Sequence, residues 1–128
     1  DYGSMVALRP QAFQVRLTPE LFLQEIAGAR TFVMESEVEA LRQQGFGTHL
    51  TASDLVVFSE DGSVIDNQLR WPDEPVRHKI LDCLGDLFLC GGAFAGDVIA
   101  RKSGHQLNHV MAMVISMSTS GMTERRAA

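Results

Sequence analysis

The segment VRHKILDCLGD, Val76 to Asp86, constrains the fold more than any other part of this chain. Consecutive residues of an α-helix are rotated by about 100°, so residues four positions apart lie on one face. On such a helix His78, Asp82 and Asp86 form one stripe of ionisable side chains. A second stripe is apolar and consists of Val76, Ile80, Leu84 and Leu87. The sequence therefore predicts a helix with one side on a core and a separate titratable side.

The titratable stripe has the residue types of a metal site. His78 can bind an ion through a ring nitrogen and Asp82 through a carboxylate oxygen, at about 2.0–2.2 Å for zinc. Two ligands do not complete a catalytic zinc site, which has three protein ligands and an open position for water. A solvated helix face with a weak His–Asp pair is the alternative interpretation. Gly85, beside the stripe, costs the helix about 1 kcal/mol relative to alanine and leaves space for a ligand or another backbone.

A second motif is RKSGH, which ends at His105. Ser103 and Gln106 have the spacing of a capping box, so we expect the last helix to begin near Ser103. The helix dipole would lower the pKa of a histidine in the first turn, and a carboxylate such as Asp86 would raise it again. Such a histidine can transfer protons near neutral pH. The alternative is a surface histidine, which is also our interpretation of His49 and His109.

Other patterns predict the remaining elements. Thr18 as N-cap, Pro19 at the first helical position and Glu20 in the first turn predict a helix to about residue 27 or 29. A second helix is expected over residues 35–44 and a third from Glu74 to about Leu89, with Asp73 as its cap. MVALRP and AFQVRL predict paired strands, LVVF-EDG-SVI a hairpin and DVIAR a strand. We therefore expect an α+β fold, a two-layer sandwich in which helices pack on one face of a mainly antiparallel sheet.

The size and charge of the chain limit its organisation. The 128 residues fit one domain, expected over residues 1–117, with a frayed polar tail over residues 118–128. A net charge of −5 argues against nucleic acid as a partner. Apolar runs are shorter than the about 18 residues that span a bilayer, so no transmembrane segment is expected. Cys83 and Cys90 lack a metal or redox spacing and are interpreted as reduced cysteines in or near the core.

Three segments together resemble one family. ARTF (Ala29–Phe32), DEPVRHKILDCLGDL (Asp73–Leu87) and KSGHQLN (Lys102–Asn108) are similar to the second, C-terminal domain of UDP-3-O-acyl-N-acetylglucosamine deacetylase. The resemblance covers about residues 24–112, and HKILD followed by KSGH is its specific part. It implies a cytoplasmic zinc hydrolase of lipid A biosynthesis, in which water attacks the N-acetyl group of a UDP-sugar lipid precursor.

The resemblance also implies roles on the titratable stripe. His78 and Asp82 would be two of the three ligands of one Zn²⁺ ion. Asp86 would hydrogen-bond His105 and hold its charge. His105 would protonate the leaving amine as general acid, or stabilise the oxyanion as an imidazolium.

Four further residues match the family in its oxyanion and substrate sites. Thr31 would help to stabilise the oxyanion of the tetrahedral intermediate. Lys79 and Lys102 would contact the nucleotide-sugar substrate, whose diphosphate needs positive partners. Phe32 would contact the sugar or the acyl portion of the substrate.

The family pattern is incomplete in this chain. The family has two similarly folded domains with the active site between them, and an HxxEH-type motif of the first domain supplies the third zinc ligand and the general base. The chain lacks that motif, because His49 in FGTHLT has the wrong context. The resemblance thus implies that the first domain is absent, that it is a partner of this one, and that the chain alone is inactive. The alternative function is a diverged, non-catalytic module that binds a sugar nucleotide.

Overall fold

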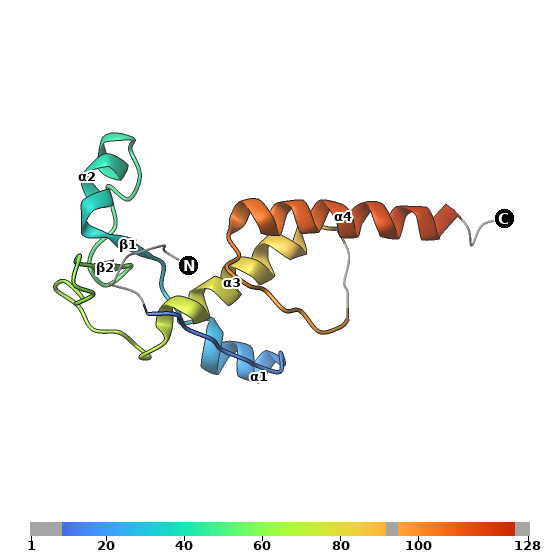
Figure 1. Ribbon diagram of the computed structural model, residues 1–128, viewed down its shortest axis with the longest axis horizontal. Coiled ribbons are helices and arrows are strands. Elements are labelled where there is room, and N and C mark those ends of the chain that lie inside the picture. Colours follow the sequence, from blue (N-terminus) through green and yellow to red (C-terminus); the bar gives the residue numbers. More distant parts are fainter. Residues whose placement is uncertain (1–8, 92–94, 125–128) are drawn as a thin grey trace. The chain divides into compact units, whose positions relative to one another are not determined.

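The computed structural model describes residues 9–91 and 95–124, with side chains as far as residue 118. The chain divides into two compact units, Asp1–His78 and Lys79–Ala128. Figure 1 shows the elements in chain order: α1 Pro19–Leu21, the π-helical turn η1 Phe22–Ile26, β1 Phe32–Met34, α2 Glu35–Gln43, β2 Val56–Phe58, α3 Glu74–Phe88 and α4 His105–Glu124.

The sheet differs from the predicted one. The strands found in the described residues, β1 and β2, pair in parallel, with Phe32 opposite Val56 and Met34 opposite Phe58. The connection between them contains α2, and a parallel pair requires such a crossover, whereas a short turn produces an antiparallel hairpin. The prediction of an α+β two-layer sandwich with a mainly antiparallel sheet is therefore wrong.

The other predicted strands fail for lack of a pairing partner. Residues 13–17 and 97–101 are described and are not strands, while residues 5–8 lie outside the described part. Val98 and Ile99 are 53% and 81% exposed. An apolar alternation becomes a strand only where another segment satisfies its backbone groups. The predicted hairpin after β2 is reduced to one antiparallel bridge, between Phe58 and Val64.

The first and third helices begin where the sequence predicts. Thr18 caps α1, since its side chain accepts a hydrogen bond from the Leu21 amide at 3.2 Å, and Pro19 opens the helix. α3 runs over Glu74–Phe88, so it begins at the predicted residue and ends one residue before the predicted Leu89. Local capping and periodicity were sufficient here because both signals lie within the helix itself.

The last helix begins later than predicted. α4 starts at His105, two residues after Ser103, and the Gly104 carbonyl accepts from the Asn108 amide at 3.0 Å, so the residue before the helix is Gly104 and not the predicted cap Ser103. α4 continues to Glu124, past residue 118 where we expected the tail to begin. Residues 125–128 lie outside the described part. His105 still occupies the first turn.

Each unit has a small core. In the first unit Met34, Val56 and Phe58 are buried together, and partly buried Phe32, Val64 and Leu69 surround them. The rings of Phe32 and Phe58 meet edge to face, with centroids 6.1 Å apart. The strands therefore bring Phe32, and with it the ARTF segment, to the edge of the first core.

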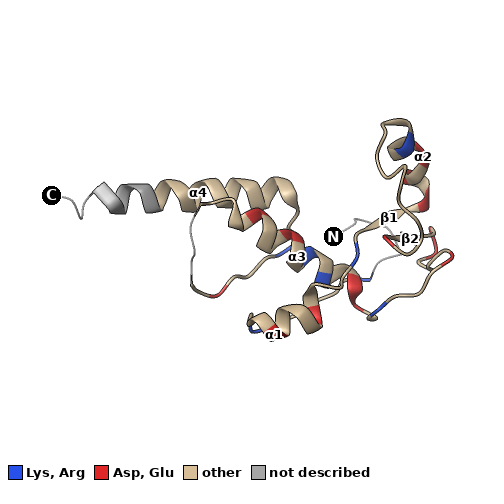
Figure 2. Cartoon of the chain, turned by 180° about the vertical axis from the view of Figure 1, so that it is seen from behind, with Lys and Arg blue, Asp and Glu red and all other residues tan. Residues whose placement is uncertain are grey.

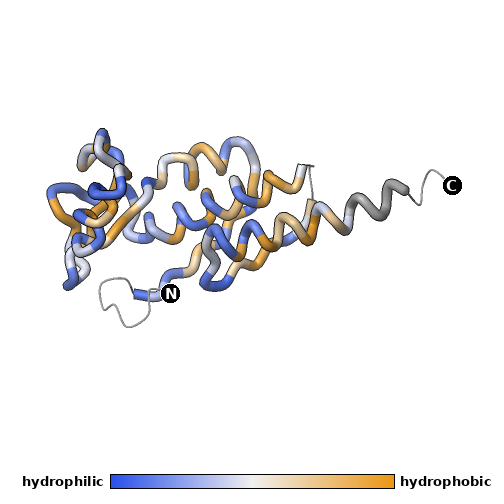
Figure 3. Tube along the Cα trace, turned by 90° about the horizontal axis from the view of Figure 1, so that it is seen from above, coloured by the Kyte–Doolittle hydropathy of each residue, from blue (hydrophilic) through white to orange (hydrophobic). Residues whose placement is uncertain are grey.

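In the second unit α4 packs on the part of α3 that follows Lys79. The buried residues are Cys83, Leu87 and Ala112. Between residues 105 and 118 α4 contains no Lys, Arg, Asp or Glu and is tan throughout (Figure 2). Its apolar residues, orange in Figure 3, alternate with polar ones. Across the described residues no helix is both long enough and apolar enough to span a lipid bilayer.

Candidate active site

Asp86 is the centre of a hydrogen-bonded group in the second unit. Asp86 is 8% exposed, and its carboxylate accepts hydrogen bonds from three side chains of α4. Oδ2 lies 2.8 Å from Nδ1 of His105 and 3.0 Å from Nδ2 of Asn108. Oδ1 lies 3.0 Å from Nε2 of His109. The spacing of one helical turn between His105 and His109 lets both rings reach the same carboxylate.

The negative charge of Asp86 makes Nδ1 of His105 a hydrogen-bond donor. Burial raises the pKa of Asp86, but hydrogen bonds from Asn108, His105 and His109 outweigh it and hold the pKa below its ordinary value. An ionised carboxylate is an acceptor only, so Nδ1 of His105 is the donor in this contact. Nε2, the other ring nitrogen, lies 3.9 Å from Oδ2 of Asp82.

The same group can hold a cation. Asp86, His105 and His109 each offer one ligand atom, and these atoms lie within 4.8 Å of one another. Imidazole and carboxylate are the ligands that zinc takes in catalytic sites. The prediction of His109 as a surface residue without a constellation missed this contact. The available signal was the spacing of four residues between His105 and His109 on one predicted helix.

Asp82 is engaged by Lys79. The Lys79 ammonium donates to Oδ2 of Asp82 at 2.9 Å, and the Asp82 side chain is 12% exposed. The structure therefore places a residue expected to contact the substrate against one expected to bind zinc. A cation on the same oxygen would compete with this ion pair.

His78, in the first unit, is oriented by the backbone. Its Nδ1 lies 3.0 Å from the carbonyl oxygen of Ala29. A carbonyl accepts only, so Nδ1 is the donor and Nε2 is the nitrogen with the lone pair. The ring also meets Phe32 edge to face, with centroids 6.4 Å apart. Metal-binding histidines commonly donate their second nitrogen to a carbonyl or carboxylate in this way.

The remaining predicted residues are spread along the chain. Thr31 is exposed, and its carbonyl accepts from the Val56 amide at 2.9 Å at the start of the strand pair. Phe32 is partly buried, and its ring meets the rings of Phe58 and His78 edge to face. Lys102 is exposed and has a φ of 51°, in the left-handed region.

Comparison with known proteins gives the family of the chain. The sequence model of the LpxC family, described as UDP-3-O-acyl N-acetylglycosamine deacetylase, matches residues 1–116. The chain belongs to this family. The resemblance inferred from three short segments is thereby confirmed.

Curated members of the deacetylase family are longer than this chain. The UDP-3-O-acyl-N-acetylglucosamine deacetylases of Chlamydia abortus and Chlamydia trachomatis serovar L2 are each 46% identical over 92 residues. The match covers 72% of this chain and 33% and 32% of those proteins. The deacetylase of Geobacter sp. strain M21 is 41% identical over 103 residues, 80% of this chain and 34% of its own length. The chain thus spans about one third of the deacetylases it matches.

Proposed function

We propose that the complete protein is a zinc-dependent deacetylase that hydrolyses the N-acetyl group of UDP-3-O-acyl-N-acetylglucosamine in lipid A biosynthesis. This chain contributes half of the active site. The contact of 2.8 Å between His105 and Asp86 carries the proposal, because it pairs an imidazole with a buried carboxylate beside Asp82. Membership in the deacetylase family supports the choice of substrate.

His78 and Asp82 would hold the zinc ion. Both lie on α3, four residues apart. The contact of His78 with the Ala29 carbonyl leaves Nε2 as a ligand nitrogen, so the donor set suits zinc. When bound, zinc polarises a carbonyl and makes water a stronger nucleophile. The third protein ligand and the general base come from the first domain, a partner that the chain does not contain.

The group of Asp86, His105 and His109 is the competing place for the ion. Nδ1 of His105 and Nε2 of His109, the nitrogens that would bind the ion, already contact the Asp86 carboxylate at 2.8 Å and 3.0 Å. An ion there would replace the hydrogen bond that holds His105. We therefore favour His78 and Asp82 for the metal and keep His105 for proton transfer.

Amide hydrolysis needs a proton at the leaving nitrogen. As the water oxygen bonds to the acetyl carbon, the general base of the first domain takes a proton from the water. As the carbon–nitrogen bond breaks, the imidazolium form of His105 gives its Nε2 proton to the departing amine. Asp86, opposite Nδ1, keeps the ring oriented and balances its charge. The Thr31 hydroxyl stabilises the negative oxygen of the tetrahedral intermediate. The products are acetate and a free amine.

Three residues complete the proposal by binding the substrate. Lys79 and Lys102 contact the nucleotide-sugar, and Phe32 contacts the sugar or the acyl chain. Since Lys79 donates to Asp82 in this structure, its ammonium changes partner when the metal and the substrate bind. The cytoplasmic location also belongs to the proposal and rests on the family.

An acetate-release assay tests this proposal. The complete protein and the chain of 128 residues are each loaded with zinc and given UDP-3-O-acyl-N-acetylglucosamine. We expect acetate from the complete protein and none from the chain alone. Binding of the substrate without acetate release by the complete protein would favour a non-catalytic module. Turnover by the chain alone would contradict the division of the site.

A further inference from the structure

One peptide unit, between Ala29 and Arg30, is held from two sides by α3. The Arg30 amide donates to Oε1 of Glu74 at 3.0 Å, and the Ala29 carbonyl accepts from Nδ1 of His78 at 3.0 Å. These two polar groups belong to one planar unit and point in opposite directions. Rotation of the peptide would break both hydrogen bonds. The direction of the carbonyl that His78 meets is therefore coupled to Glu74.

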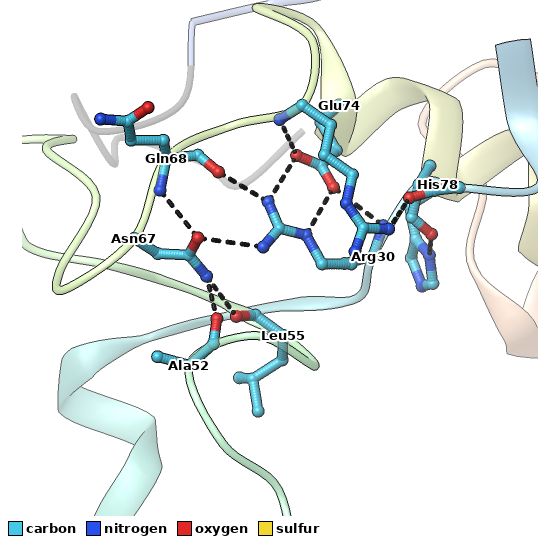
Figure 4. Close-up of polar contacts among 10 residues, drawn as sticks. Arg30, Ala52, Leu55, Asn67, Gln68, Glu74 and His78 are labelled. Carbon is cyan, nitrogen blue, oxygen red and sulfur yellow. Dashed lines mark hydrogen bonds and ion pairs between the residues drawn. The ribbon is translucent and has the colours of Figure 1, made fainter.

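The Glu74 carboxylate is buried and is held in position by several hydrogen bonds. Glu74 is 1% exposed, and Figure 4 shows its carboxylate against the guanidinium of Arg30. Nε of Arg30 lies 2.9 Å from Oε1, and Nη2 lies 3.0 Å from Oε2. The Arg70 amide adds a hydrogen bond of 2.7 Å to Oε2. Such a bidentate, charge-assisted pair fixes the position of the carboxylate as well as its charge.

The guanidinium is held in turn by the loop between β2 and α3. Nη1 of Arg30 lies 3.0 Å from Oδ1 of Asn67, and Nη2 lies 2.7 Å from the Gln68 carbonyl (Figure 4). Nδ2 of Asn67 donates to the carbonyls of Leu55 and Ala52 just before β2. The peptide is thus part of a connected polar network rather than a single contact.

We propose that Glu74 is a positioning residue for His78. Acting through the Ala29–Arg30 peptide, its carboxylate keeps the imidazole in the Nδ1–H tautomer and directs Nε2 to a metal. The inference rests on the proposed function only for the use of Nε2, since the tautomer exists without a metal. Loss of such an outer partner typically lowers metal affinity by about 10–100-fold.

The competing explanation is that Arg30 and Glu74 form an ion pair that only stabilises the fold. Variants of these two residues distinguish the two explanations. Arg30→Lys breaks the bidentate pair but keeps the backbone amide that Glu74 binds. Glu74→Gln keeps the size of the side chain but leaves one acceptor oxygen for four donors. The double variant Arg30→Met with Glu74→Leu removes the acceptor and the buried charge together, a replacement that folded proteins often tolerate. Positioning depends on the acceptor at residue 74, whereas an ion pair depends equally on both side chains.

The test is ¹⁵N NMR of the imidazole rings in the metal-free chain, with His78→Gln to assign the signal. We expect His78 to be the Nδ1–H form in the wild-type chain and in Arg30→Lys. In Glu74→Gln and in the double variant we expect a mixture of both tautomers. Asp73→Asn is the matched control, because Asp73 precedes Glu74 and pairs with Arg77 at 2.7 Å, whereas within the described part of the chain it is Glu74 that binds the Ala29–Arg30 peptide. It should leave the tautomer unchanged.

Zinc affinity of the same variants is the second measurement. We expect a loss of about 10–100-fold in Glu74→Gln and in the double variant, and little change in Arg30→Lys and Asp73→Asn. The inference is overturned if Glu74→Gln or the double variant, shown by circular dichroism to be folded, retains the Nδ1–H form of His78. If the tautomers change as expected but the complete protein has neither zinc nor deacetylase activity, the proposed function is wrong. The positioning of His78 by Glu74 would still hold.

Discussion

Nδ1 of His105 lies 2.8 Å from Oδ2 of Asp86, and the two side chains differ in burial, with 61% of the histidine and 11% of the aspartate exposed. The Asp86 carboxylate on α3 is largely buried, while the His105 ring is exposed to solvent. This combination fixes one nitrogen of the imidazole and leaves the ring accessible to a reacting group. An acid catalyst needs both properties.

Asp86→Asn should lower the turnover of the complete protein by about 10²-fold, the scale of a general acid, while zinc content stays the same. The amide keeps the size of the side chain but loses the charge that balances the imidazolium. His109→Gln is the matched control, because it removes a contact of Asp86 and leaves His105 in place. Equal losses in the two variants would show that the group acts only in packing.

Gly85→Ala should stabilise the fold by about 1 kcal/mol. The glycine lies within α3, and no described heavy atom outside its own helix backbone and neighbours lies within 4 Å of an added Cβ. Gly28→Ala is the contrasting variant, because its Cβ would meet the Trp71 ring at 3.0 Å. Urea unfolding measures both, and destabilisation by Gly85→Ala would mean that the space is filled in solution.

The sequence was informative where signals are local. The apolar stripe predicted α3 to within one residue at each end, and Thr18 with Pro19 predicted the start of α1. The same stripe selected Asp86, and the RKSGH motif selected His105. These features depend on spacing within one helix or on one capping contact, which the order of residues specifies directly.

Features that depend on distant partners were missed. The ARTF segment entered the sequence analysis only through its family resemblance, although it leads into β1 and carries the peptide that α3 holds. Arg30 and Glu74 are 44 residues apart, so no periodicity joins them. The antiparallel sheet was predicted from alternation alone, which does not say whether a neighbouring strand exists. His109 was dismissed because only the packing of α4 on α3 brings it to Asp86.

Acid should destabilise the first unit through Glu74. Burial raises the pKa of Glu74, but hydrogen bonds from Arg30 and Arg70 outweigh it and place the folded pKa below its ordinary value of 4.5. A lowered folded pKa contributes stability that is complete above the unfolded pKa and is lost as pH falls through the folded one. The unfolding free energy should therefore decline below about pH 4.5.

The double variant Arg30→Met with Glu74→Leu tests the origin of that decline. It lacks the titrating carboxylate, so its unfolding free energy should fall less between pH 5 and pH 3, as measured by urea titrations at each pH. Parallel acid declines in the wild-type chain and the double variant would assign the effect to other carboxylates.

Cys83 should react slowly with alkylating agents in the folded chain. Burial, followed by the charges of Asp86 and Asp82, raises the pKa of its thiol. A raised pKa reduces the thiolate, which is the reacting form, and burial restricts access. The rate is measured at pH 7 in a Cys90→Ser variant, with and without urea. Equal rates would indicate that the core of Cys83, Leu87 and Ala112 is open.

The most direct test of the central claim compares His78→Ala and His105→Ala in the complete protein, with zinc content and acetate release measured on the same samples. We expect loss of zinc in His78→Ala. In His105→Ala we expect retained zinc with turnover lower by about 10²-fold or more. Full zinc content in His78→Ala, or undiminished turnover in His105→Ala, would contradict the assignment of metal binding and proton transfer to these two residues.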